Sequence, residues 1–296
     1  SLFFYKKNHE KHHVKYETEI WYNHKMEKNK EKCKTKYPVM LVHGIGYNDR
    51  NHPYWGNIPG ILKKNGAKIF FSSQSGAGTI EENARQVRDS ILVALSETEA
   101  EKINLIAHSK GGLESRYLIS RLGMDEKVAS LTTLATPHRG IKAIDSLNEK
   151  SELILRSLIG VFELMIAADG GELIGDKKVF EQFSREYMDI FNEMVPDSKK
   201  VYYQSWAFDM KKPETDPAMK LFYNISLEEE GPNDGLVSVA SAMWGNFRGV
   251  YEGPQGKGIS HSAAVGKRPK LLSEGETKAL EGFYIHMVCE LKESGY

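Results

Sequence analysis

The sequence contains little cysteine, no long apolar run and no excess of charge of either sign. Cys33 and Cys289 are its two cysteines, at opposite ends of 296 residues, so a disulfide framework is not expected, although one long-range bridge stays open. No run of about eighteen apolar residues occurs, so this chain is not expected to span a membrane. The 40 Lys and Arg balance the 40 Asp and Glu, and nucleic acid is therefore not an expected partner, because phosphate binding needs a basic surface.

Length and composition are typical of one large α/β core with an inserted cap. Residues 1–36 hold ten Lys against five Glu and are predicted to form a partly solvated basic arm. Residues 37–296 are predicted to form the globular domain, with a helical insertion at about 145–198. The chain starts with a short apolar run followed by two lysines, which resembles the end of a signal peptide or anchor and predicts a secreted or cell-surface protein.

The most informative stretch, residues 101–121, reads as a buried strand, a sharp turn at Ser109 and a helix. Residues 103–107 are mostly aliphatic and carry no charge, as in a central strand covered on both faces. The turn Ala107-His-Ser-Lys-Gly111 has small residues two positions before and after the serine, and such a turn raises the serine Oγ above the sheet. The backbone N–H groups of the next helical turn point toward that serine and would stabilise negative charge there. The stretch predicts a serine nucleophile.

Strands and helices alternate on both sides of this stretch, which predicts a parallel sheet with right-handed crossovers and helices on both faces. Further strands are expected at residues 38–42, 67–72, 128–134, 200–207 and 247–251, and helices at 54–65, 80–95 and 179–192. Thr79 and Glu82 predict a capping box at the start of the second of these helices.

The first predicted strand leads into the loop His43-Gly-Ile-Gly46. In hydrolases built this way, a glycine-containing turn after the first strand supplies one oxyanion donor. We assign that donor to the Ile45 N–H and the second donor to the Lys110 N–H. His43 is expected to hold the loop through hydrogen bonds rather than to act as a base.

An acid and a histidine follow in the chain order that such a serine requires. Asp234 lies in a turn bounded by proline and glycine, and His261 comes after a glycine-rich loop. An acid on a turn at the sheet edge can accept a hydrogen bond from a histidine on the next loop and fix its tautomer. The alternatives that stay open are Asp209 and Asp216 for the acid, and His138 and His286 for the base.

Five motifs occur in a characteristic order: His43-Gly, Tyr54-Trp-x-x-Ile-Pro59, the elbow stretch at residues 104–113, Thr136-Pro-His-Arg-Gly140 and Asn233-Asp-Gly-Leu-Val237. Over roughly residues 37–290 the chain resembles the bacterial triacylglycerol lipases of the Pseudomonas and Burkholderia type, with Ala107 as the variant seen in Bacillus-type lipases. The resemblance implies an α/β-hydrolase fold, a carboxylic ester hydrolase, and a triad of Ser109, Asp234 and His261.

Two departures from these families concern metals. The Pseudomonas and Burkholderia type has a calcium-ligating Asp two residues after the triad histidine, and this chain has Ala263 there. The Bacillus-type zinc lipases have a histidine pair before the elbow, and no such pair lies between His52 and His108. No cofactor is therefore expected to be required, and neither structural calcium nor zinc is supported.

Residues 150–168 predict a helix that is apolar almost all round. Such a helix is either packed in a core or exchanges between covering an apolar cleft and meeting an apolar surface. The resemblance to lipases favours a mobile lid, with Leu158, Phe162 and Met165 on its substrate side. The expected partners are an apolar ester and a lipid–water or polymer interface.

Serine, acid and histidine together predict hydrolysis of acylglycerols or other apolar esters, aliphatic polyesters included, through a covalent acyl-enzyme. The same machinery can serve as an acyltransferase or a thioesterase. A hydrolase-fold binding module without activity is the remaining alternative.

Overall fold

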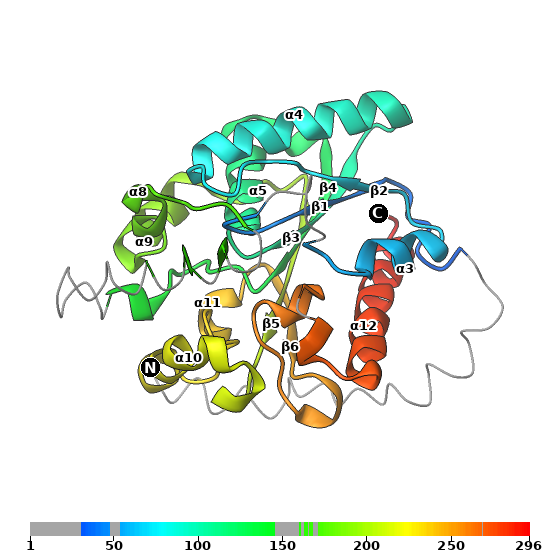
Figure 1. The fold of residues 1–296 in the computed structure, drawn as a ribbon. Helices are drawn as coiled ribbons and strands as arrows, with labels where there is room; N and C mark the ends of the chain where they lie inside the picture. The colour runs from blue at the N-terminus through cyan, green and yellow to red at the C-terminus, as the bar shows by residue number, and fades with distance from the viewer. Residues whose placement is uncertain are drawn as a thin grey trace.

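The sheet contains six parallel strands in the order β2-β1-β3-β4-β5-β6 (Figure 1). It is seen in a computed structural model that describes residues 31–47, 54–145, 160, 163–164, 166–167, 171–267 and 269–296. The strands are β1 (Val39–Val42), β2 (Ile69–Phe71), β3 (Ile103–His108), β4 (Val128–Leu134), β5 (Tyr202–Phe208) and β6 (Asn246–Tyr251). Consecutive strands run in the same direction, which confirms the parallel sheet that the alternation of elements predicts.

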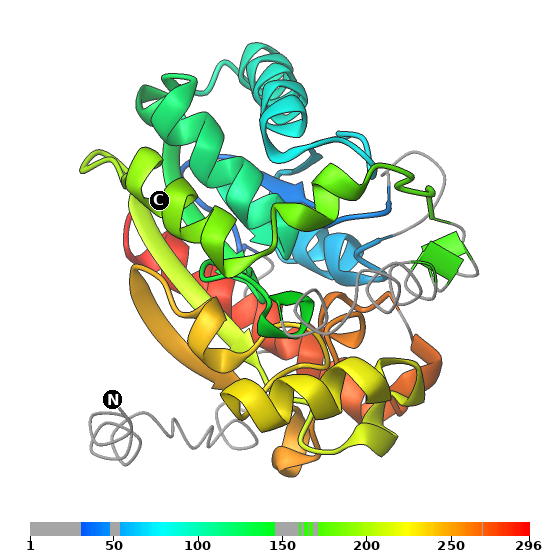
Figure 2. The same cartoon turned by 90° about the vertical axis from the view of Figure 1, so that its left-hand side faces the viewer.

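Two hydrophobic cores lie on the two faces of this sheet. Successive side chains of a strand point to opposite faces, so each strand contributes residues to both cores. In β1, Met40 and Val42 pack in the core beneath α4 (Ile80–Thr98) and α5 (Lys110–Arg121). Val39 and Leu41 point the other way, into the core shared with α3 (Ile58–Lys64) and α12 (Glu274–Glu293). Figures 1 and 2 show the sheet between these two helical layers.

Local signals account for most helix boundaries. Thr79 and Glu82 form the predicted capping box at the start of α4, each side chain bonding the other's backbone N–H. The helix predicted at residues 54–65 is shorter than expected and begins at Ile58, because residues 54–57 form a turn. The backbone N–H of Ile58 donates to the carbonyl of Trp55 within that turn.

The single helix predicted at residues 179–192 is wrong. The structure has two helices there, α8 (Lys177–Glu181) and α9 (Arg185–Met194), separated by a short turn. Ser184 begins the second helix as its N-cap and accepts a hydrogen bond from the Tyr187 N–H, so the new helix changes direction at this residue. Two further helices were not predicted, α10 (Lys220–Glu230) and α11 (Val239–Ala242).

Most of the predicted lid, residues 150–168, lies outside the described residues. Leu158, Phe162 and Met165 all lie outside the described residues. Of their described neighbours, Ile166 is buried while Leu164 is exposed. In the described part of the chain, no helix is both long enough and apolar enough to cross a membrane.

Candidate active site

Ser109 lies on a strained turn between β3 and α5. Its φ of 55° and ψ of −131° are unfavourable for a residue with a Cβ, and its N–H donates to the carbonyl of Leu134 on β4 at 2.9 Å. A Cβ on Gly111 would lie 2.4 Å from the carbonyl oxygen of His43, and one on Gly112 would lie 2.1 Å from Thr136 Oγ1. The turn therefore needs the two glycines that follow it, which is the packing the elbow motif predicts.

Asp234 and His261 are joined directly by a hydrogen bond. The distance between His261 Nδ1 and Asp234 Oδ2 is 2.7 Å, and both residues are buried. The other carboxylate oxygen of Asp234 accepts from the backbone N–H groups of Leu236 at 3.0 Å and Val237 at 2.7 Å. These bonds fix the carboxylate, and the carboxylate orients the imidazole through its Nδ1.

His108 connects this pair to the serine. It precedes Ser109 in the chain, and its ring centroid is 4.4 Å from that of His261. Its Nδ1 is 2.6 Å from the hydroxyl of Tyr54. Burial first, and then the nearby His261 ring, hold the pKa of His108 well below its ordinary value, so His108 is a neutral neighbour of the base. The Asp234–His261 pair thus lies beside the residue that precedes Ser109, at the carboxyl ends of the strands, where ligands of open α/β folds bind.

The glycine loop after β1 lies against the serine. A Cβ on Gly44 would come within 2.9 Å of Ser109 Cβ, so this position also requires glycine. The two ring nitrogens of His43 lie 2.8 Å from the carbonyl oxygen of Gly44 and 3.1 Å from that of Gln74, so the ring N–H donates within the loop, in line with the structural role expected for it. Ile166, which belongs to the predicted lid at residues 150–168, packs against Gly46, so this part of the segment contacts the loop.

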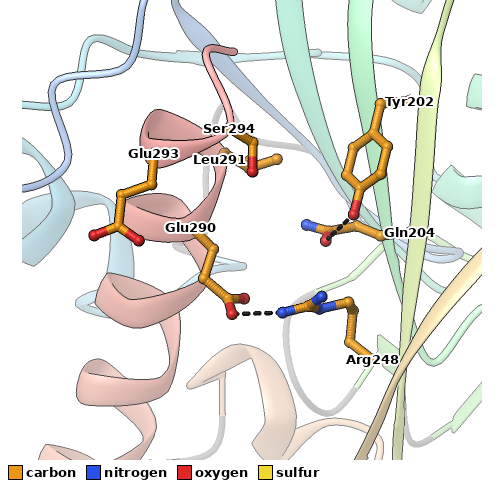
Figure 3. Close-up of a pocket in the computed structure, with 7 residues that line it drawn as sticks. All are labelled: Tyr202, Gln204, Arg248, Glu290, Leu291, Glu293 and Ser294. Atoms are coloured by element: carbon orange, nitrogen blue, oxygen red, sulfur yellow. Dashed lines mark hydrogen bonds and ion pairs between the residues drawn. The ribbon is translucent and has the colours of Figure 1, made fainter.

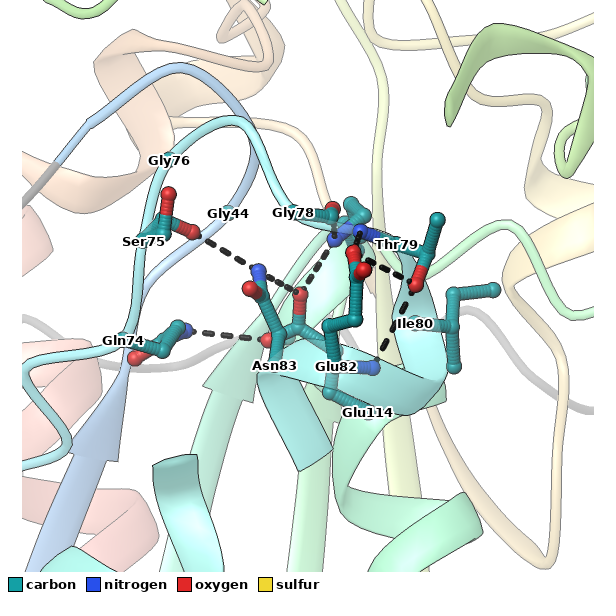
Figure 4. Close-up of polar contacts among 12 residues, drawn as sticks. Gly44, Gln74, Ser75, Gly76, Gly78, Thr79, Ile80, Glu82, Asn83 and Glu114 are labelled. Carbon is teal, nitrogen blue, oxygen red and sulfur yellow. Dashed lines mark hydrogen bonds and ion pairs between the residues drawn. The ribbon is translucent and has the colours of Figure 1, made fainter. Parts of the chain in front are cut away.

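Beneath the elbow lies a buried polar network centred on Glu114. Its carboxylate accepts from Lys110 Nζ at 2.6 Å, Asn83 Nδ2 at 2.8 Å and Gln74 Nε2 at 3.0 Å. Lys110 also donates to the carbonyl of Gly78 at 2.7 Å. Figure 4 shows Gln74 and Asn83 converging on Glu114 from the loop and helix that follow β2. The network ties α5, and with it the residue after Ser109, to the neighbouring loops.

Removing the acid of this network is expected to destabilise the fold strongly. In Glu114→Ala the Lys110 ammonium, which has no exposed surface, would lose its counter-charge, and breaking a buried pair costs about 3–5 kcal/mol. The midpoint of thermal unfolding should fall by on the order of 10 °C. Calorimetry checks this, with Lys278→Ala as the matched control, because that pair has the same spacing but is exposed. A midpoint for Glu114→Ala as high as that of the control would contradict the buried pair.

The rival histidines are engaged elsewhere. His138 is buried, with Arg116 at 3.3 Å from its Nδ1 and the Thr133 hydroxyl at 3.1 Å from its Nε2. Burial, followed by the charges of two nearby arginines, holds the pKa of His138 well below its ordinary value. His286 lies on α12 with about half of its side chain exposed and pairs with Glu290. Neither histidine is placed to bond Asp234 as His261 does.

The two alternative acids also have other partners. Asp209 forms an ion pair with Lys211 at 3.1 Å. Asp216 is fully buried, and its Oδ2 accepts from the hydroxyls of Ser260 at 2.8 Å and Ser262 at 3.3 Å, the residues on either side of His261. Asp216 therefore holds the loop of residues 260–264, called the histidine loop below, through its serine hydroxyls. Asp234 bonds the ring of His261 itself.

The residues present do not fit the calcium site of the resembling lipases. Ala263 is buried and offers no oxygen ligand, and the carboxylate of Asp216 is bonded to hydroxyls of the same loop. The loop is also held by the Tyr284 hydroxyl, which donates to the carbonyl of Ala264 at 2.9 Å. Among the described residues no group of three His, Cys, Asp or Glu side chains could hold a metal ion.

A polar pocket lies far from this chemistry. It is formed where the beginning of β5 and the middle of β6 face the end of α12 (Figure 3), and its lining residues are Tyr202, Gln204, Arg248, Glu290, Leu291, Glu293 and Ser294. Arg248 and Glu290 pair across it. Because the pocket is lined by the first residues of β5 and Ser109 follows the last residue of β3, the two lie toward opposite ends of the parallel strands.

Several residues of the site were missed at the sequence level. A sequence signal existed for Glu114, because Lys and Glu four apart on a helix can pair. Tyr54 stands in one of the motifs that carry the lipase resemblance, but nothing in the sequence shows that its hydroxyl reaches His108. Asp216 was considered only as the triad acid, since its bonds to Ser260 and Ser262 depend on the fold.

The chain is similar to several known proteins. Residues 38–198 match the family model described as palmitoyl protein thioesterase. Triacylglycerol lipase 2 of Saccharomyces cerevisiae is 27% identical over 287 residues, which cover 92% of this chain and 80% of the relative. A triacylglycerol lipase of Pseudomonas fragi is 27% identical over 296 residues, covering 88% of this chain and 98% of the relative. The predicted resemblance to triacylglycerol lipases is confirmed.

The solved structures confirm the α/β-hydrolase fold. The crystal structure of a Bacillus licheniformis lipase in its mature form superimposes with a TM-score of 0.66 at 16% identity, over 86% of this chain and 92% of that chain. At this identity the likeness establishes the fold, and the chemistry has to be argued from the residues.

Proposed function

The chain belongs to the palmitoyl protein thioesterase family, and within that family we propose that it hydrolyses carboxylic esters with apolar acyl groups, using Ser109 as the nucleophile. The observation that carries the proposal is the bonded pair of Asp234 and His261 beside the strained turn of Ser109. The relatives named triacylglycerol lipase support the ester hydrolase class. Serine nucleophiles of this kind need no cofactor.

In the proposed reaction, His261 Nε2 removes the hydroxyl proton of Ser109, and Oγ attacks the ester carbonyl. The bond to Asp234 stabilises the imidazolium that forms. His261 then gives the proton to the leaving alcohol, and the acyl group remains on Ser109. Water, activated by the same histidine, attacks the acyl-enzyme and releases the carboxylic acid.

The negative oxygen of the tetrahedral intermediate would be stabilised by backbone N–H groups. We assign this role to Ile45, in the loop that contacts Ser109, and to Lys110, the first residue of α5. The first N–H groups of a helix have no partner within the helix, and its dipole favours negative charge at this end. The Glu114 network supports the assignment because it holds the Lys110 side chain and, through Gln74, the carbonyl of His43.

Thioester hydrolysis is the second candidate, and the family match over residues 38–198 favours it. The same nucleophile can attack either kind of carbonyl, so the substrate must be settled by competition. We expect kcat/KM for p-nitrophenyl butyrate to exceed that for butyryl-coenzyme A, because the named relatives are triacylglycerol lipases. A thioester preferred by tenfold or more, abolished by Ser109→Ala, would overturn the ester proposal and leave the nucleophile in place.

A lid over the site would make activity depend on the physical state of the substrate. We propose this role for residues 150–168, because wetting an apolar face costs roughly 25 cal/mol per Å² and an oil surface removes that cost. Replacing Leu158 and Phe162 by Ser should raise activity on soluble esters relative to emulsified triacylglycerol. The ratio of the two rates is the measurement. If the variant unfolds and the wild type is indifferent to emulsification, the segment belongs to the core.

Chelation is expected to have little effect. Because hydroxyls bonded to Asp216 and a hydroxyl from α12 hold the histidine loop, prolonged treatment with EDTA should leave activity and melting temperature nearly unchanged. Calorimetry and a p-nitrophenyl ester assay before and after dialysis check this. A loss that calcium restores would reveal a set of oxygen ligands outside those described.

A further inference from the structure

The fold brings the two cysteines of the chain together. Cys33 lies in a turn before β1, and Cys289 lies in the last third of α12. Cys33 Sγ is 3.8 Å from the carbonyl oxygen of Ile285, one helical turn before Cys289, and Cys289 Sγ is 3.4 Å from the carbonyl oxygen of Lys32. Each sulfur thus reaches the backbone beside the other.

The two thiols also influence each other's ionisation. Interaction with the Cys289 thiol, together with burial, raises the pKa of Cys33 far above its ordinary value. Interaction with the Cys33 thiol lowers the pKa of Cys289, which is partly exposed while Cys33 is fully buried. Cys289 is therefore the thiol that ionises first and that a reagent from solution can reach.

Hydrogen bonds around the two cysteines hold the segment before β1 against the end of the chain. Lys292 Nζ donates to the carbonyl of Glu31 at 2.7 Å, and the Lys36 N–H donates to the carbonyl of Tyr296 at 2.7 Å. The Cys33 N–H is bonded to the carbonyl of Asn65 at 2.8 Å. These contacts keep the segment before β1 against α12, so a bond between the sulfurs needs little movement of the backbone.

We propose that Cys33 and Cys289 form an intramolecular disulfide that covalently ties the segment before β1 to α12 when the protein meets an oxidising compartment. The Cys289 thiolate attacks a low-molecular-weight disulfide, forming a mixed disulfide and releasing one thiol. The Cys33 thiol then loses its proton and attacks Cys289 Sγ, releasing the second thiol. The protein gives up two hydrogen atoms, and the small disulfide is reduced to two thiols.

The bridge would act on stability rather than on turnover. It closes a loop that spans most of the chain, and loops of this size gain the most from cross-linking. Its helix, α12, supports the histidine loop through the Tyr284 hydroxyl, but neither sulfur contacts the residues of the triad. Oxidation should therefore raise the melting temperature by about 10 °C, while kcat for a soluble ester changes less than twofold.

The test compares one protein in two redox states. The full chain is incubated with reduced or with oxidised glutathione, the remaining thiols are alkylated, and both samples are analysed by mass spectrometry and calorimetry. The expected result is an oxidised chain that carries no alkyl group and is lighter by two hydrogen atoms than the unmodified reduced chain, a linked pair of peptides containing Cys33 and Cys289, and the higher melting temperature. Cys289→Ser should melt like the reduced wild type in both buffers.

Three outcomes would overturn the proposal. Two alkylated cysteines after oxidation would show that the bridge does not form. A stable glutathione adduct on Cys289 would show that Cys33 cannot attack it. A bridge that leaves the melting temperature unchanged would show that it does not stabilise the fold. None of these outcomes depends on esterase activity, so the proposal is tested separately from the proposed function.

Discussion

Ser109→Ala is expected to lower kcat for a soluble ester by about 10⁴- to 10⁶-fold, because the variant cannot form an acyl-enzyme. Weak residual hydrolysis would remain from substrate binding and the oxyanion donors. Alanine occupies the same strained backbone as serine, so the melting temperature should stay close to that of the wild type. Steady-state turnover of p-nitrophenyl butyrate and calorimetry on the same preparation measure both effects.

Ser115→Ala is the matched control for this experiment. Ser115 is buried on α5, the helix that follows Ser109, and its hydroxyl donates to the carbonyl of Gly111 within that helix. Its loss should change kcat by less than about threefold. If Ser109→Ala kept more than about one per cent of wild-type activity, another group would have to be the nucleophile.

His261→Ala is expected to be about as damaging as Ser109→Ala, and Asp234→Asn to lower kcat by about 10⁴-fold. The asparagine would still fill the site but could present an N–H to His261 Nδ1, which selects the wrong tautomer of the imidazole. Because the three residues act as a unit, the double variant Ser109→Ala with His261→Ala should be no slower than Ser109→Ala alone.

The alternatives weighed from the sequence serve as controls here. Asp209→Asn removes a carboxylate that pairs with Lys211, and His286→Ala removes a half-exposed ring on α12. Both variants should keep kcat within a few-fold of the wild type. A loss of several orders of magnitude in Asp209→Asn, with an active Asp234→Asn, would reassign the acid. The same loss in His286→Ala, with an active His261→Ala, would reassign the base.

The central strands could be predicted closely from the sequence. The strand predicted at 128–134 has those bounds in the structure, and β3 extends the predicted one only to His108. Continuous buried aliphatic runs of this kind identify a doubly covered strand without knowledge of its neighbours. The capping box at Thr79 fixed one helix start in the same local way.

The errors arose where local pattern was misleading or absent. The apolar spacing of residues 179–192 suits one helix, but Ser184 is a good N-cap and interrupts it. Helix α10 has apolar residues such as Leu221 and Leu227 on its exposed side, so its pattern does not mark a single buried face. In the first segment a local cap outweighs the apolar spacing, and in the second the spacing does not show which face is buried.

In the candidate site, the proposed triad residues could be predicted from the sequence, whereas the residues that support them could not. Motif order was enough to nominate Ser109, Asp234 and His261, because elbow, acid turn and histidine loop each have a local signature. The groups that support them come from distant segments, as when Asp216 bonds the serines beside His261 or Asn83 bonds Glu114. Such partners depend on the packed sheet and helices, and the sequence carries no local sign of them.

The central claim is that one covalent acyl-enzyme forms on Ser109, and reaction with diethyl p-nitrophenyl phosphate tests it most directly. The reagent resembles the tetrahedral intermediate, and its phosphoryl group stays on an activated serine. We expect release of one equivalent of p-nitrophenol per chain, parallel loss of esterase activity, and a diethylphosphoryl group on the peptide that contains Ser109. Complete inactivation with the label on another residue, or a chain that neither reacts nor hydrolyses esters, would contradict the account.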